Sequence, residues 1–325
     1  MERRNQTKVT EFIFQGFSDS AELQIFYFVV FLMIYIIALT GNLLIFTVIR
    51  SESQLHTPMY FFVSNLSVLD TFYISITVPR MLADFLSQTK KISFSACVVQ
   101  LSFFLSMAAT ESALLATMAY DRYVAICNPF MYPIVMNRTV CILLATASWL
   151  VGVIYSVIHT SKTFRLNFCG SNIINHYFCD IPPLLKLSCS DTTINVILVF
   201  VVGGLLMLGC FVLILISYVN IIRAILKISS AKGRSKTFST CVSHLTTVGL
   251  FYITGSCVYM RPASTHSLDQ EKIGALLYSV IAPMLNPYIY SLRNKELKGA
   301  IMNVIRKKNH FSETLEASGF NIQVP

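Results

Sequence analysis

Long stretches without a charged side chain dominate the pattern of this chain. Five of them reach or exceed the roughly 20 residues that a helix needs to cross a bilayer. They contain no Asp, Glu, Lys or Arg and run from Leu23 to Ile49, Thr139 to Ser161, Thr192 to Ile222, Thr237 to Met260 and Ile273 to Leu292. Their length and apolar character predict five membrane-spanning helices.

Two further apolar stretches each contain a single acid near the middle, Met59 to Pro79 with Asp70 and Ile92 to Tyr120 with Glu111. None of the seven alternates polar and apolar residues as the strands of a membrane barrel do. Of all residues, 54% are hydrophobic and 13% are charged, whereas soluble domains carry roughly 25% charged residues. The sequence therefore predicts an all-α membrane protein with a seven-transmembrane helix bundle.

Basic residues indicate how the bundle is oriented. If the N-terminus lies outside and the C-terminus inside, the cytoplasmic segments include five bases from Arg223 to Lys236 and six from Arg293 to Lys308, as the positive-inside rule favours. Leu297, Ile301 and Val304 share one face of the last segment, which predicts a short amphipathic eighth helix on the membrane lipid. The expected divisions are an extracellular segment 1–22, a bundle 23–292, a cytoplasmic helix 293–308 and a tail 309–325.

Cysteines support the same orientation. Cys97 begins the third span, and Cys169, Cys179 and Cys189 lie in the loop between the fourth and fifth spans. All four are on one side of the membrane, and disulfides persist in oxidising compartments, so that side is expected to be extracellular. Their spacing leaves three pairings open. With the N-terminus outside, Asn5 is the expected glycosylation site.

Seven blocks of residues, taken in order, resemble a known family. They are Gly41-Asn42, PMYFFVSNLSVLD (58–70), MAYDRYVAIC (118–127), Trp149, Ser217-Tyr218, KTFSTCVSHL (236–245) and PMLNPYIYSLRN (283–294). Together with the loop of three cysteines they resemble the rhodopsin-like (class A) G-protein-coupled receptors, and within these the olfactory (odorant) receptors. The resemblance covers about Phe12 to Lys308. It implies disulfides Cys97–Cys179 and Cys169–Cys189.

The resemblance also implies a signalling mechanism. Arg122 would be held by Asp121 at rest, and agonist binding would move the inner end of the sixth span outward to admit a G protein. Such a switch is a two-state element that a ligand biases. The implied partner is the heterotrimeric olfactory stimulatory G protein, which raises cyclic AMP. The expected coupling residues are Asp121, Arg122, Tyr123, Tyr218, Asn286, Pro287 and Tyr290.

The two acids within spans form a separate candidate site. An acid facing lipid at a helix centre costs roughly 2.5–3.5 kcal/mol on insertion scales, so Asp70 and Glu111 are expected to face the bundle interior. The resemblance places Asp70 in a sodium pocket. We hypothesise that Asp70 and Glu111 hold an allosteric sodium ion or share a proton, and so favour the inactive state. A purely structural polar network is the alternative.

A ligand site is expected near the extracellular mouth. Helical spacing places Phe104, Leu105, Ala108 and Ser112 on one side of the third span. The resemblance adds Val202, Leu206, Tyr252, Ser256, Tyr259, Tyr278 and Ser279. These positions offer no charged side chain, and a charged ligand would lack a buried partner. The expected ligand is a small, largely apolar, uncharged volatile odorant, with at most a hydrogen bond or two to Tyr259 or Ser256.

Other functions are less favoured. There is no phosphate loop, nucleophile elbow or zinc pattern, and His244 has no second ligand at metal spacing, so no enzyme and no cofactor beyond the sodium ion is expected. The net charge of +9 fits membrane contact rather than nucleic acid. The resemblance implies a multi-pass plasma-membrane protein of olfactory neuronal cilia. A rhodopsin-like receptor for a non-odorant metabolite outside the nose, and an ion transporter or channel, remain as alternatives.

Overall fold

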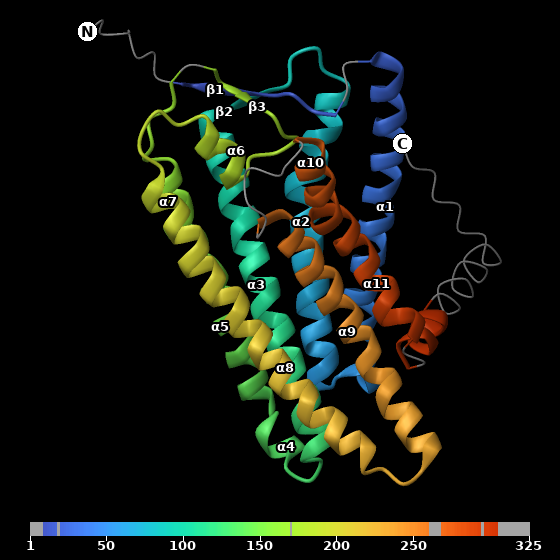
Figure 1. Cartoon of the computed structure of the whole chain (residues 1–325). Coiled ribbons are helices and arrows are strands. Elements are labelled where there is room, and N and C mark those ends of the chain that lie inside the picture. The colour runs from blue at the N-terminus through green and yellow to red at the C-terminus, as the bar shows by residue number, and fades with distance from the viewer. Residues whose placement is uncertain (1–8, 18–19, 170, 260–267, 294–295, 305–325) are drawn as a thin grey trace, which may run out of the picture.

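The computed structural model describes residues 9–17, 20–169, 171–259, 268–293 and 296–304. Seven helical stretches are long and apolar enough to cross a membrane, which confirms the predicted bundle (Figure 1). Four are the single helices α1 (Ala21–Ser51), α2 (Pro58–Phe85), α3 (Phe94–Cys127) and α5 (Arg138–Thr163). The expected tail 309–325 and glycosylation site Asn5 lie outside the described residues.

The last three spans are α9 and two composite helices. The fifth span joins α7 (Thr193–Leu198), a π-helical turn η2 (Val199–Gly203) and α8 (Gly204–Leu226), and the sixth is α9 (Ala231–Tyr259). The seventh joins α10 (Leu268–Leu276), a second π-helical turn η4 (Leu277–Ile281) and α11 (Ala282–Arg293). A further helical stretch covers 296–304, within the expected amphipathic segment.

Local sequence explains several helix boundaries. Pro58 opens α2 at a position where a missing N–H is tolerated. The hydroxyl of Ser93 accepts the Ala96 N–H at 3.2 Å at the start of α3, and the side chain of Asn137 accepts the Val140 N–H at 3.0 Å at the start of α5. Short elements complete the inner and outer loops: a 3₁₀ turn η1 (Ser53–Leu55), α4 (Tyr132–Val135) and α6 (Ile181–Lys186).

Helices α2 and α3 form the centre of the bundle. They bury a larger share of their residues than the other spans, whereas α1 and α8 present mainly apolar side chains to lipid. Gly152 on α5 allows a close approach to α3, because a Cβ at that position would overlap the Thr110 hydroxyl. The central position of α2 and α3 places both intramembrane acids in the interior, with Asp70 0% and Glu111 2% exposed.

A small sheet, which the sequence analysis did not predict, lies at the extracellular end. Its central strand is β1 (Glu11–Phe14), which pairs antiparallel with β2 (Lys91–Ser93) and parallel with β3 (Ile173–Ile174). Figure 1 shows the sheet at the end of the bundle opposite α4. Through the pairing of β1 with β2 and β3, the N-terminal segment connects the first and second extracellular loops.

Candidate functional site

A cavity of ≈ 140 Å³ lies among the outer halves of the helices. This volume is roughly ten times the minimum that one water needs, which suits a ligand of about ten heavy atoms. The walls come from α2, α3, α5, α6, the fifth span, α9 and η4. The lining residues are Tyr73, Phe104, Leu105, Ala108, Ala109, Tyr155, Ile181, Val199, Phe200, Gly203, Gly204, Leu206, Met207, Phe251, Gly255, Ser256 and Tyr278.

Six of the expected ligand residues line this cavity: Phe104, Leu105, Ala108, Leu206, Ser256 and Tyr278. Ser112, Val202, Tyr252 and Ser279 do not belong to the lining, and the side chain of Tyr259 lies outside the described residues. Ser112 and Tyr252 instead share a hydrogen bond of 3.0 Å between their hydroxyls. This bond joins α3 to α9 one helical turn further in than Ala108.

The lining contains no acidic or basic side chain among the described residues. The lining residues that carry a hydroxyl are Ser256 and three tyrosines, Tyr73, Tyr155 and Tyr278. Transfer of a charged group into such surroundings is costly without a partner. The cavity is therefore suited to an uncharged, mainly apolar molecule that uses few hydrogen bonds.

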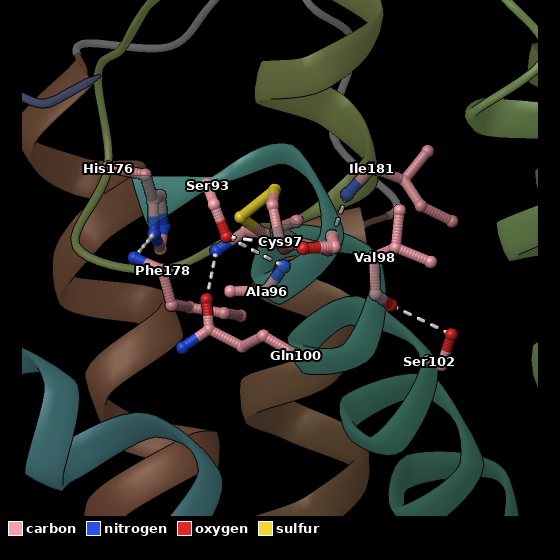
Figure 2. The surroundings of a disulfide bond; sticks show 12 residues. Ser93, Ala96, Cys97, Val98, Gln100, Ser102, His176, Phe178 and Ile181 are labelled. Carbon is pink, nitrogen blue, oxygen red and sulfur yellow. Dashed lines mark hydrogen bonds between the residues drawn. A yellow bond between two sulfur atoms is a disulfide. The ribbon is translucent and has the colours of Figure 1, made fainter. Parts of the chain in front are cut away.

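The second extracellular loop forms the roof of the cavity, to whose lining it contributes Ile181. Figure 2 shows the disulfide that attaches this loop to α3. A disulfide joins Cys97 of α3 to Cys179 of the loop, and a second joins Cys169 to Cys189, the pairing that the family resemblance implied. Next to the first disulfide, the side-chain oxygen of Gln100 accepts the Cys179 N–H at 2.9 Å. The disulfide and this hydrogen bond fix the loop directly above α3.

Three adjacent rings of this loop, those of His176, Tyr177 and Phe178, are buried in the roof. Phe178 is fully buried and packs on Phe104 of the cavity wall, with 4.7 Å between ring centroids. The Tyr177 hydroxyl forms a 2.9 Å hydrogen bond with Ser279 of η4. Burial, with help from the nearby Lys272 and Lys186, lowers the pKa of His176 to about 3, so its ring is neutral at physiological pH.

A polar network occupies the inner ends of the helices. Arg122 donates two hydrogen bonds to Asp121, at 3.0 and 2.6 Å, and the Tyr132 hydroxyl donates to the other oxygen of Asp121 at 2.8 Å. Asp121 is 1% exposed at its side chain, and Arg122 14%. The arginine is therefore held against α3, and α4 of the second inner loop is attached to the same carboxylate.

Three further inner hydrogen bonds connect neighbouring spans. The Nε2 atom of His244 lies 3.0 Å from the Leu115 carbonyl, which can only accept, so Nδ1 accepts the Tyr218 hydroxyl at 2.8 Å. The Ser243 hydroxyl donates to the Ile289 carbonyl at 3.0 Å. These contacts join α3, α8, α9 and α11. Of the expected coupling residues, Tyr218 belongs to this group, Pro287 and Tyr290 are buried nearby on α11, and Tyr123 is half-buried on α3.

His244, Ser243 and Tyr132 are polar contacts that sequence reasoning missed. The spacing around His244 argues against a metal site and carries no sign of a hydrogen-bonding role. Tyr132 lies ten residues beyond Arg122, and no periodicity relates it to Asp121. The position of His244 in an apolar span could have predicted this role, because a neutral histidine there needs a hydrogen-bonding partner for each ring nitrogen.

The acid site lies between the cavity and the inner network. The Asn286 side-chain amide donates to Asp70 at 2.9 Å, and Asp70 and Glu111 are close enough to interact electrostatically. Three buried oxygens accept no hydrogen bond from the described residues: Asp70 Oδ1, Asn42 Oδ1 and Asn286 Oδ1. Oxygen acceptors of this kind are the ligands that hard cations prefer. The donor set therefore fits a sodium ion.

Comparison with known proteins agrees with this arrangement. A family model described as "Olfactory receptor" matches residues 31–308. Olfactory receptor 5AR1 of mouse is 52% identical over 308 residues, covering 95% of this chain and 99% of the relative. Olfactory receptor 5I1 of human is 51% identical over 305 residues, covering 94% and 97%. The chain belongs to the olfactory receptor family of G-protein-coupled receptors, multi-pass proteins of the plasma membrane.

Proposed function

We propose that this receptor binds a small, uncharged, largely apolar volatile odorant in the cavity beneath the second extracellular loop. The observation that carries the proposal is the cavity itself, which has ≈ 140 Å³ of space and no charged lining residue among those described. Ser256 and the tyrosine hydroxyls supply the few hydrogen bonds that would orient the ligand. Hydrophobic contact with rings such as Phe104 supplies most of the affinity.

The proposed partner inside the cell is the olfactory stimulatory G protein, with cyclic AMP as the product of signalling. The support is the inner network, in which Arg122 is paired with Asp121 and α9 is attached to α3 and α8 through His244. In the active state the Arg122–Asp121 pair and the hydrogen bonds of His244 would be rearranged. A ligand that binds this state better would expose Arg122 and Tyr218 to the G protein. The proposed location is the ciliary membrane of olfactory sensory neurons.

The proposal is tested by a panel of uncharged volatile compounds applied to cells that express the receptor, with cyclic AMP as the readout. The Arg122→Ala variant is expected to give no response, and the Arg138→Ala variant, which removes an exposed cation at the same face, should respond like wild type. A response that survives Arg122→Ala, or a ligand-driven current in cells lacking the G protein, would contradict it.

We also propose that Asp70 and Glu111 hold a sodium ion, or a shared proton, that favours the inactive state. Asp70, Asn42 and Asn286 would ligate the ion through the three oxygens that lack a hydrogen-bond donor, and Glu111 would add a second negative charge that interacts with Asp70. The ion would neutralise part of this buried negative charge. Glu111→Ala should then change basal and ligand-driven signalling at normal surface expression, and unchanged signalling would rule the hypothesis out. Glu22→Ala, at an exposed position, serves as the control.

A further inference from the structure

The inner ends of α8 and α9 enclose a groove that takes no part in the site described above. Its volume is ≈ 520 Å³. Figure 1 shows these two helix ends joined by a short loop, at the opposite end of the bundle from the sheet. The lining consists of Ile222, Ile225 and Leu226 from α8 and Ala231, Arg234, Ser235 and Phe238 from α9.

The groove lies at the inner boundary of the membrane. One candidate span ends at Leu226 and the next begins at Ala231, so the groove is between the cytoplasmic ends of both. Three of its apolar side chains are strongly exposed: Leu226 by 68%, Phe238 by 52% and Ile222 by 49%. At this depth, exposed apolar side chains face the acyl chains of lipid rather than water.

The charge around the groove has a single sign. Five bases lie between Arg223 and Lys236, and no Asp or Glu occurs anywhere from Thr192 to Leu268. Arg223, Lys227, Lys232 and Arg234 are all exposed. The ion pairs found among the described residues lie elsewhere, at Arg80–Asp84, Lys91–Glu11 and Arg122–Asp121. The bases at the groove thus have no carboxylate of this chain nearby in sequence to neutralise them.

We propose that this groove binds one anionic phospholipid of the inner leaflet. Its acyl chain lies along Ile222, Leu226 and Phe238, and its phosphate groups face Arg234 and Lys227. The inner leaflet supplies anionic lipids, and basic pockets between membrane helices on the cytoplasmic side bind phosphoinositide headgroups. A guanidinium such as that of Arg234 pairs with phosphate through two parallel hydrogen bonds. A zwitterionic lipid would leave the surplus positive charge unmatched.

A lipid in this position contacts α8 and α9 together. It therefore favours the arrangement in which the inner ends of these helices lie side by side, and it acts outside both the odorant cavity and the Arg122 network. The proposal depends on neither the identity of the odorant nor that of the G protein, and it can be tested on the receptor alone.

The test uses full-length receptor in nanodiscs of phosphatidylcholine containing phosphatidylinositol bisphosphate, with retained lipids counted by native mass spectrometry. Three proteins are compared with wild type. The double variant Lys227→Gln with Arg234→Gln removes the lining cation Arg234 and the exposed cation next to Leu226, and Ala231→Phe fills the groove without changing charge. The double variant Arg138→Gln with Lys298→Gln is the matched control, because both residues are exposed cations at the inner face and outside the groove.

Wild type and the control should retain one phosphatidylinositol bisphosphate in preference to phosphatidylcholine. The groove double variant and Ala231→Phe should each bind it about tenfold or more weakly. If the groove double variant and the control double variant lost equal affinity for phosphatidylinositol bisphosphate, general charge attraction would explain the binding and the proposal would be overturned. The proposal would also be overturned if Ala231→Phe bound the lipid normally while soluble inositol trisphosphate displaced it, because the headgroup alone would then account for binding. It would be overturned as well if the groove variants kept the lipid and lost only nucleotide exchange on added G protein.

Discussion

The outer cavity and the inner network of this bundle are built from different kinds of contact. Around the cavity, the walls are aliphatic and aromatic side chains such as Phe104, Leu105 and Phe251, and the polar atoms are a few hydroxyls. At the inner end, Arg122 donates to Asp121 within α3, and hydrogen bonds of defined geometry connect Asp121 to α4 and His244 to α3. Apolar contacts tolerate exchange of one apolar side chain for another of similar volume, whereas a buried hydrogen bond is lost when one partner is replaced. The cavity can therefore vary with the ligand while the network keeps one switching geometry.

Removing the acid of the inner network should have the largest effect. Asp121→Asn deprives Arg122 of its charged partner, and loss of one member of a buried ion pair costs about 3–5 kcal/mol. The resting arrangement should weaken, so basal cyclic AMP should rise several-fold at matched surface expression. Asp191→Asn, at an exposed position of the second extracellular loop, is the control and should leave basal signalling unchanged. Unchanged basal signalling in Asp121→Asn would show that the pair does not restrain the receptor.

Acidification should affect the roof of the cavity. The pKa of His176 is about 3 in the folded loop and 6.5 in its ordinary state. Between pH 3 and pH 6.5 the open loop therefore binds more protons than the closed loop. The neutral ring of His176 contributes its full stability to the closed roof above pH 6.5, and this contribution is lost as the pH falls. Between pH 7.4 and 5 the roof should lose about 2 kcal/mol.

Hydrogen exchange of the amides of Tyr177 and Phe178, corrected for the intrinsic effect of pH, measures this loss. His176→Gln cannot be protonated and should show protection that does not change with pH. If wild type and His176→Gln gave the same pH dependence, the neutral histidine would not contribute to the closed roof.

A smaller effect is expected from a single hydrogen bond of the network. Tyr218→Phe removes the 2.8 Å bond to His244 and leaves the ring in place. Such a bond contributes about 1 kcal/mol, which corresponds to a change in the switching equilibrium of about fivefold. Tyr35→Phe removes a hydroxyl bonded to Ser75 at 3.2 Å between α1 and α2 and is the control. Equal effects of the two substitutions on ligand-driven cyclic AMP would mean that the inner network has no special role.

The apolar runs of the sequence were sufficient to predict the fold, but they did not reveal the extracellular sheet. Glu11–Phe14 is only four residues long, and its partner strands lie about 80 and 160 positions further along the chain. No local periodicity connects such distant segments. The seven spans were predictable because each must be apolar over its whole length, whatever its neighbours are.

The cavity was partly predictable, and two of the failures, Val202 and Ser279, lie in π-helical turns. Phe104, Leu105 and Ala108 follow regular spacing on α3 and line the cavity as expected. On the fifth span, Val202 was expected, but Gly203, Gly204 and Met207 line the cavity with Leu206. Val202 comes from the family resemblance and lies within the π-helical turn Val199–Gly203, which changes the angular position of the residues around it. The pair Tyr278 and Ser279 lies in the second π-helical turn, and only Tyr278 faces the cavity.

Odorant binding is assigned to the outer cavity and switching to the inner network. Measuring odorant binding and stimulation of nucleotide exchange separately on purified receptor tests this division most directly. In the absence of G protein, Arg122→Ala should bind an odorant identified in the panel with nearly wild-type affinity, and on addition of G protein it should not stimulate nucleotide exchange. Ala108→Phe, which fills the cavity, should lose odorant binding and keep basal exchange. Loss of odorant binding in Arg122→Ala, odorant-stimulated exchange by Arg122→Ala, or normal odorant binding in Ala108→Phe would each contradict the account.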